Sequence, residues 1–148
     1  MTAALEEIRT VLEGEGGLIA QALLDRAGGW GTDLPGEELG ARVAAGPRAA
    51  ADPAAYAFVV EAIHEGHLLH DGRSRLLDQS DRDLALLAGD RLYALGLERL
   101  AALGDLEAVA ILAEAISRCA QARAEGRPQL AAQAWEDATR QLAGDLAP

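Results

Sequence analysis

Histidine and acidic side chains in the middle of the sequence have a spacing that could support metal binding. Glu61, His64, His67 and Asp71 recur every three or four residues, and His70 lies among them. Because successive residues on an α-helix turn by about 100°, the first four share one face and His70 lies at its margin. Imidazole and carboxylate groups are the ligands that zinc takes in proteins. The segment therefore contains the ligand types of a metal site.

The same spacing is also typical of histidines that pack in a core or lie at the surface. Ligands three residues apart on one helix are placed only loosely around an ion, and the sequence marks no further ligand outside this segment. We therefore predict no metal site. If a metal ion were held, the candidate ligands would be His64, His67, His70 and Asp71.

The elements that must position these side chains are helices. Aromatic residues make up only 3% of the chain, alanine and leucine are its most frequent residues, and β-branched residues are scarce. With 148 residues, half of them apolar, the chain is long enough to bury one core. We predict an all-α helical bundle that forms a single domain over residues 1–148.

Apolar periodicity, capping residues and glycine stops predict the helix boundaries. Asp52 and Pro53 suit the start of a long helix, and Asp105 suits the start of another, whose wide apolar arc implies a central position. The segment 28–53 is rich in Gly and Pro, and we expect it to be the most flexible part. The predicted helices are 3–13, 18–26, 36–45, 53–71, 80–103, 105–125 and 128–142.

Three short motifs follow one another in an order that resembles a known family. The stretch Glu61-Ala-Ile-His-Glu-Gly-His-Leu-Leu-His-Asp71 is followed by Leu87-Ala-Gly-Asp90 and then by Leu103-Gly-Asp105. The trans-prenyl diphosphate synthases carry Glu-x-x-His-x-x-Ser/Thr-Leu-x-His, then Asp-Asp-x-x-Asp, and then a Leu-Ala-Gly-Asp helix. The chain resembles this family, which implies a bundle like the N-terminal half of the isoprenoid synthase fold.

The chain departs from the family at the positions that carry its chemistry. Asp71 matches the first aspartate of Asp-Asp-x-x-Asp, whereas Gly72 and Arg75 stand where the other two belong. Asp90 matches the family's residue, and we expect it to hydrogen-bond within the bundle. Upstream, residues 28–35 resemble the family's Gly-Gly-Lys-Arg-x-Arg-Pro segment without its cations. Family members are longer, and their second aspartate motif has no counterpart here.

These departures remove the ligands that the family's reaction needs. In the family, Mg²⁺ ions between two carboxylate clusters offset the charge that develops on the diphosphate leaving group. Magnesium needs hard oxygen ligands. Asp71 would supply part of one cluster, and Arg73 and Arg75 add positive charge beside it. The resemblance therefore implies a catalytically degenerate protein with no catalytic residues and no cofactor, and with Mg²⁺ bound only if residual diphosphate binding persists.

Arg73 and Arg75 have two interpretations. Guanidinium groups bind phosphate bidentately without a metal ion, so both residues are candidates for ligand or phosphate binding. The alternative, which we prefer, is that both side chains lie in a solvated loop after the helix.

The resemblance implies that the protein works by association. We expect a non-catalytic or regulatory subunit in isoprenoid biosynthesis, either as a homodimer or as a heteromer with the catalytic subunit of a prenyl diphosphate synthase. Half of a large bundle would leave apolar faces that a partner could cover.

Two alternatives come from other classes of protein. Residues 68–72, Leu-Leu-His-Asp-Gly, are similar to the signature of the HD-type metal-dependent phosphohydrolases, although no histidine precedes His64. The other alternative is a bundle that binds a small molecule or prenyl lipid in a pocket between the helices at 53–71 and 81–103.

Charge and cysteine content exclude further classes and suggest a compartment. The net charge of −11, with no lysine, argues against nucleic-acid binding and against insertion into anionic membranes. The single cysteine, Cys119, falls in an apolar helical run, where we expect a buried thiol in a reducing compartment. Without a basic segment and apolar core near Met1, we expect a cytoplasmic protein. Trp30 and Trp135 are expected to be packing residues.

Overall fold

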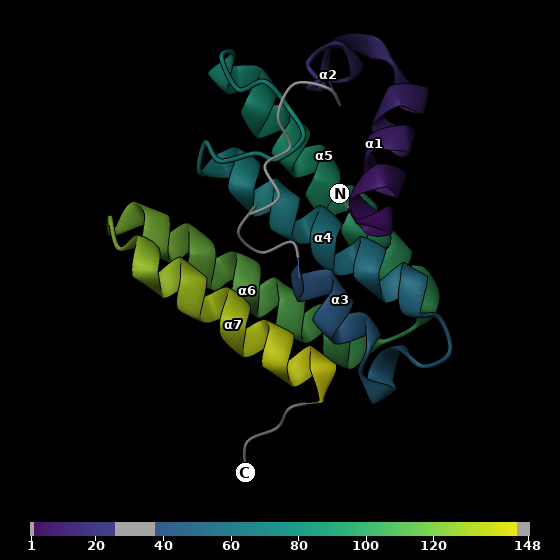
Figure 1. Ribbon diagram of the computed structural model, residues 1–148. Coiled ribbons are helices and arrows are strands. Elements are labelled where there is room, and N and C mark those ends of the chain that lie inside the picture. The colour runs from purple at the N-terminus through teal and green to yellow at the C-terminus, as the bar shows by residue number, and fades with distance from the viewer. Residues whose placement is uncertain (1, 26–37, 145–148) are drawn as a thin grey trace.

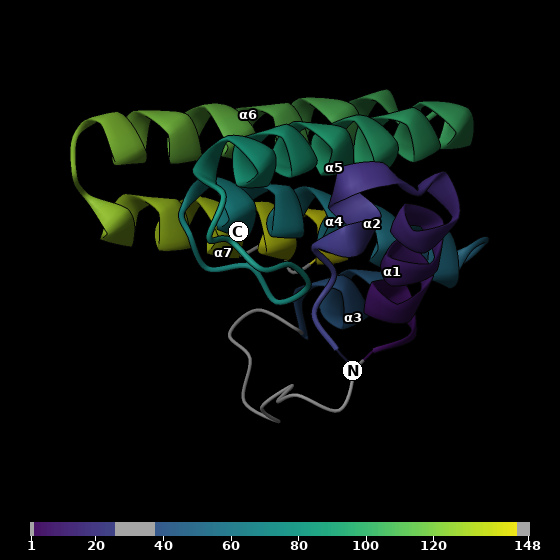
Figure 2. The ribbon, with the colours of Figure 1, turned by 90° about the horizontal axis from the view of Figure 1, so that it is seen from above.

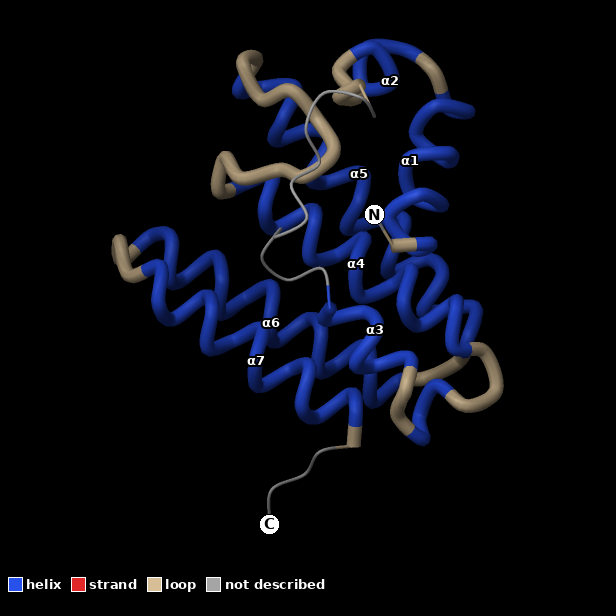
Figure 3. Tube along the Cα trace, in the orientation of Figure 1, coloured by secondary structure: helices blue, strands red, loops and turns tan. Residues whose placement is uncertain are grey.

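The chain folds into a bundle of helices. The computed structural model describes residues 2–25 and 38–144. Within these ranges the regular structure is helical, apart from one isolated antiparallel bridge between Leu23 and Leu77 (Figure 3). The predicted all-α class is therefore confirmed. No helix of the described part combines the length and the apolar character that a membrane crossing requires.

Four long helices carry most of the described chain, and their bounds lie close to those predicted. They are joined by three shorter α-helices and a single 3₁₀ turn (Figure 1). In chain order the elements are α1 (Ala3–Glu15), α2 (Gly17–Gln21), α3 (Glu38–Ala44), η1 (Pro47–Ala49), α4 (Pro53–His70), α5 (Arg82–Leu103), α6 (Leu106–Ala124) and α7 (Pro128–Ala143).

Aspartate caps begin three of the long helices. Asp52, Asp81 and Asp105 each accept a hydrogen bond from the backbone N–H three residues further along the chain. Such a bond satisfies one of the unpaired donors in the first turn of a helix. The starts of α4 and α6 at Asp52 and Asp105 are therefore as predicted.

The second helix is shorter than the sequence predicts. It ends at Gln21, because the next residues pair with the loop before α5: the N–H of Leu24 donates to the carbonyl of Leu76, and the N–H of Asp78 donates to the carbonyl of Ala22. These bonds replace further helical turns. The segment 28–53 is the part expected to be most flexible, and its residues 28–37 lie outside the described residues. The helix predicted at 36–45 is described from residue 38 onward, as α3.

Helix α4 lies at the centre of the bundle. It packs against α1, α3, α5 and α6, and most of its side chains are buried on every side (Figures 1 and 2). The expectation that the helix beginning after Asp105 is central is wrong. On α6 the buried residues form one stripe that includes Leu112 and Cys119, and Leu106 at its start is 80% exposed.

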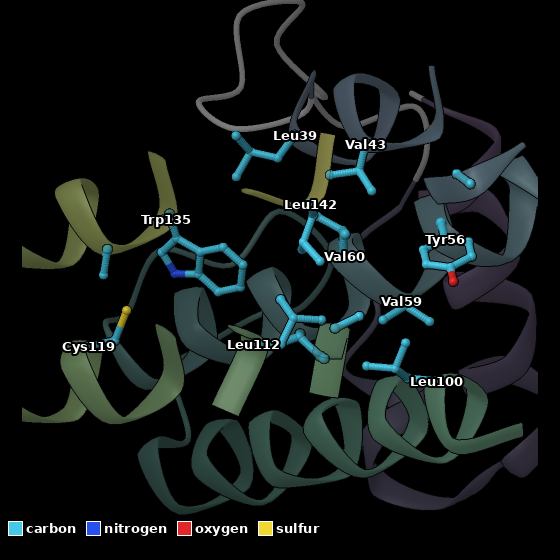
Figure 4. Close-up of a cluster of buried hydrophobic side chains, with 14 of the residues drawn as sticks. Leu39, Val43, Tyr56, Val59, Val60, Leu100, Leu112, Cys119, Trp135 and Leu142 are labelled. Carbon is cyan, nitrogen blue, oxygen red and sulfur yellow. The ribbon is translucent and has the colours of Figure 1, made fainter. Parts of the chain in front are cut away.

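Apolar side chains from α4 divide the core into two clusters. One cluster joins α4 to α6 and α7 and contains Val60, Leu112, Trp135 and the buried free thiol of Cys119 (Figure 4). The other packs α1 and α5 against the opposite side of α4. The packing role predicted for Trp135 and the burial predicted for Cys119 are confirmed, whereas Trp30 lies outside the described residues.

Glycines bring α4 and α5 into direct contact. A Cβ atom at Gly66 would lie 2.7 Å from Cδ1 of Tyr93 and 2.9 Å from the carbonyl oxygen of Gly89. This close approach leaves no room for a ligand where the helices cross.

Replacing Gly66 by alanine should destabilise the fold. The added methyl group would be forced against Tyr93 and the backbone of α5, and overpacking of this kind costs about 1–3 kcal/mol. As a control, Gly14→Ala adds a methyl group where no atom lies within 4 Å and should stabilise α1 by about 0.5–1 kcal/mol. Urea unfolding measures both changes. Equal stability of the two variants would contradict the close packing of α4 on α5.

Candidate functional site

The polar residues singled out from the sequence lie on the C-terminal half of α4 and in the loop that follows it. Glu61, His64 and His67 are buried, and Arg73 is exposed. The structure does not gather them around one point. Most of them form three separate groups, each with different partners, whereas His64 and Arg73 belong to none of these groups.

The first group is a buried set of ion pairs around Arg75. Its Nε donates to Glu65 Oε2 at 2.8 Å, and its Nη2 donates to Glu61 Oε2 at 2.8 Å. Only 3% of Arg75 is exposed. The prediction that Arg75 lies in a solvated loop is therefore wrong, because two carboxylates one turn apart on α4 draw its side chain inward. The guanidinium group is also turned away from any phosphate in solution.

Further hydrogen bonds tie this buried group to other elements. Glu61 accepts the backbone N–H of Gly40 from α3 at 3.0 Å, and the hydroxyl of Ser74 donates to Glu65. Burial raises the pKa of Glu61 even though Arg75 opposes the shift. Burial by itself would lower the pKa of Arg75, but Glu65 and Glu61 outweigh it and raise that pKa. The group thus joins α3, α4 and the loop after α4.

Removing the cation of this group should be severely destabilising. Arg75→Leu leaves two buried carboxylates without their cation, and breaking a buried pair costs about 3–5 kcal/mol. The loss should be larger at pH 8 than at pH 5, because burial raises the pKa of Glu61, which binds a proton more readily at low pH when Arg75 no longer opposes that shift. Arg73→Leu, in the same loop, should change stability by less than about 0.5 kcal/mol. Chemical denaturation at both pH values measures the effect, and similar losses in the two variants would contradict it.

The second group is centred on Asp71, the residue compared above with the first aspartate of Asp-Asp-x-x-Asp. Oδ1 of Asp71 accepts a hydrogen bond from Nε of Arg123 at 2.8 Å, and its Oδ2 lies 3.2 Å from Nε2 of His67. Gly72, the next residue, has a positive φ of 74° in the turn that ends α4. Both carboxylate oxygens of Asp71 thus contact basic groups of the protein.

The third group lies on the other side of α4. Nε2 of His70 lies 3.1 Å from Oδ1 of Asp90, and its ring packs near Tyr93. The side chain of Asp90 is 69% exposed, and its contact with His70 joins α5 to α4. His70 and Asp71 therefore have partners on different helices and do not converge as the two residues of a His-Asp metal site would. No three His, Cys, Asp or Glu side chains of the described chain are close enough together to hold a metal ion.

Two adjoining clefts open beside these groups, the first between the end of α4 and α7, and the second between the loop after α4, α6 and the start of α7. We call the first the histidine cleft. It has a volume of about 190 Å³ and is lined by His64, His67 and Trp135, with Arg73 and Asp71 among its other lining residues. The edge of the Trp135 ring faces His64, with the ring centres 4.8 Å apart.

We call the second the arginine cleft. It has a volume of about 270 Å³, is lined by Arg123 and Arg127, and shares Asp71 and Arg73 with the histidine cleft. Sequence reasoning missed Arg123 and the contact between Trp135 and the histidines. Nothing local marks them, because α6 and α7 follow α4 only after the whole of α5.

The two buried histidines are held in the neutral form. Burial lowers the pKa of His64 well below its ordinary value, and the nearby charges of Arg75 and Arg73 lower it further. Burial also lowers the pKa of His67, against the opposing effect of Asp71. Nδ1 of each ring has no hydrogen-bond partner among the residues that the structure describes. Neutral imidazoles with unused hydrogen-bonding capacity therefore line the histidine cleft.

The neutral histidines should make stability depend on pH. A histidine whose pKa is lowered by folding binds protons more readily when unfolded, so its contribution to stability is lost as pH falls through 6.5. For His64 we expect a loss of about 1 kcal/mol between pH 7.5 and 5.5. The raised pKa of Glu61 has the opposite effect, because it makes the folded state more stable as pH falls. The contribution of His64 is therefore isolated by comparing the wild type with His64→Gln. Urea unfolding should show a shallower fall in the variant, and identical pH profiles would contradict this assignment.

Comparisons of the chain with protein-family models, with curated proteins and with solved structures found no match.

Proposed function

We propose that this protein is a non-catalytic relative of the trans-prenyl diphosphate synthases that works by association, with itself or with a full-length synthase, in isoprenoid biosynthesis. The order of the sequence motifs suggests the relationship. The main support for the absence of catalysis is the buried position of Arg75. Arg75 stands where the family has the last aspartate of its first motif.

The environment of the motif supports a role without metal chemistry. Mg²⁺ is usually bound through one or two free carboxylates together with phosphate oxygens and water. Here Asp71 is paired with Arg123, Gly72 contributes no ligand, and Arg75 is paired with Glu61. A metal ion would have to displace Arg123 and His67 from Asp71 before it could use that carboxylate.

The described surface has few apolar side chains that a partner could cover. The large exposed ones are all leucines, and two of them belong to helices that contact each other, Leu18 on α2 and Leu87 on α5. Another, Leu106, lies at the start of α6. The broad uncovered face expected for half of a bundle is not found in the described residues, so an association would use a small apolar contact with a polar rim.

The proposal predicts that the chain alone does not catalyse prenyl transfer. It also predicts that the chain forms a stable dimer or a complex with a synthase, which sedimentation velocity can detect. The chain incubated with an allylic diphosphate, isopentenyl diphosphate and Mg²⁺ should give no more product than a blank. It should sediment as a dimer, or as a complex with a full-length prenyl diphosphate synthase from the same cell. Leu87→Glu should weaken association by about tenfold or more, because it places a charge in an apolar contact.

Leu106→Glu is the matched control, since it adds the same charge to an exposed leucine elsewhere and should leave the complex intact. Product formation that requires Mg²⁺ and is lost in Asp71→Asn would overturn the non-catalytic role. A chain that stays monomeric with and without the synthase would overturn the association.

A further inference from the structure

The histidine cleft contains a buried side chain whose hydrogen-bonding groups the fold does not use. His64 is 6% exposed and makes no hydrogen bond or ion pair with any other described residue, although it lines the cleft. Buried polar groups are normally satisfied, because an unpartnered one costs free energy. A neutral imidazole offers one N–H donor and one acceptor nitrogen, so His64 can bind a ligand that enters the cleft.

The charges around this cleft favour an anion. The side chain of Arg73 is exposed at the cleft and has no hydrogen bond or ion pair within the described ranges. Arg73 and the buried Arg75 both act electrostatically on His64. The carboxylates that line the cleft are already balanced, since Asp71 pairs with Arg123 and Glu136 pairs with Arg42. The unbalanced charge at the cleft is therefore positive.

The remaining wall of the cleft is apolar. Leu68 from α4 and Pro128, Ala131 and Trp135 from α7 line it. The ring of Trp135 contacts both histidines. A ligand with a charged head and a small apolar body would match the two parts of this surface.

We propose that the histidine cleft binds a small phosphate monoester directly, without a metal ion. The planar guanidinium of Arg73 donates two hydrogen bonds to the phosphate oxygens, and an N–H of His64 donates a third. The apolar body of the ester lies against Trp135 and Ala131. The acidic motif beside the cleft takes no part in binding, because Asp71 remains paired with Arg123. This site is independent of the association proposed above.

Phenyl phosphate and inorganic phosphate are suitable probes. Both carry the head group, but only phenyl phosphate has an apolar body, so it should bind about tenfold more tightly. Titration calorimetry with and without EDTA measures both affinities, and EDTA should change neither. Equal affinities for the two probes would overturn the apolar part of the site, and loss of binding in EDTA would overturn its independence from metal.

The residues are tested by a matched pair of variants. Arg73→Ala should weaken phenyl phosphate binding about tenfold or more, since it removes charge-assisted hydrogen bonds, and it should fold normally because Arg73 is exposed and unpaired. Arg140→Ala removes an exposed arginine of α7 that lines neither cleft, and it should change the affinity less than about twofold. Equal losses in both variants would show general charge attraction and overturn the proposal.

Nuclear magnetic resonance of the ring nitrogens gives an independent test in the unmodified protein. The chain has three histidines, and His70 is an internal control because it lies beside Asp90 on the other side of α4. Phenyl phosphate should shift the ring signals of His64 and leave those of His70 unchanged. A His64 signal that does not move at saturating ligand would overturn the proposed contact.

Discussion

The buried ion pairs between Arg75 and the two glutamates of α4 hold together the parts of the molecule on which the site depends. They fix the loop after α4 against the central helix, and through Gly40 they fix α3 as well. Buried charges persist only when paired and hydrogen-bonded, and here both carboxylates have several donors. The position of α3 in turn places Leu39 in the wall of the histidine cleft. Arg73, two residues before Arg75, is left on the outside.

The burial of α4 explains why its polar residues behave so differently from one another. A helix covered on every side must satisfy each polar group inside the protein. Glu61 and Glu65 do so through Arg75, and His67 does so through Asp71. Within the described residues His64 makes no such bond, Nδ1 of His67 also has none, and both rings border the histidine cleft. Helix α4 therefore carries, within a single turn, glutamates whose carboxylates are paired inside the protein and a histidine that faces a cleft.

Local signals in the sequence predicted most of the fold. Aspartate caps, a proline in the first turn and glycines after the last turn place the long helices within a few residues, because these preferences act between neighbours in the chain. Errors occurred where distant segments meet. Helix α2 stops early because the chain after it pairs with the loop before α5, and α6 is less buried than its apolar arc suggested because only one of its faces is covered.

The sequence by itself determined the helical class, the helix starts, and the absence of carboxylates at Gly72 and Arg75. It also placed the histidines and Asp71 on one helix. Only the tertiary structure decided what each of these side chains touches. The inward turn of Arg75, the pairing of Asp71 with Arg123 and the contact of Trp135 with His64 join residues from separate helices. The physical reason is that electrostatic pairing and desolvation depend on distance in space, whereas helix formation and capping depend on distance along the chain.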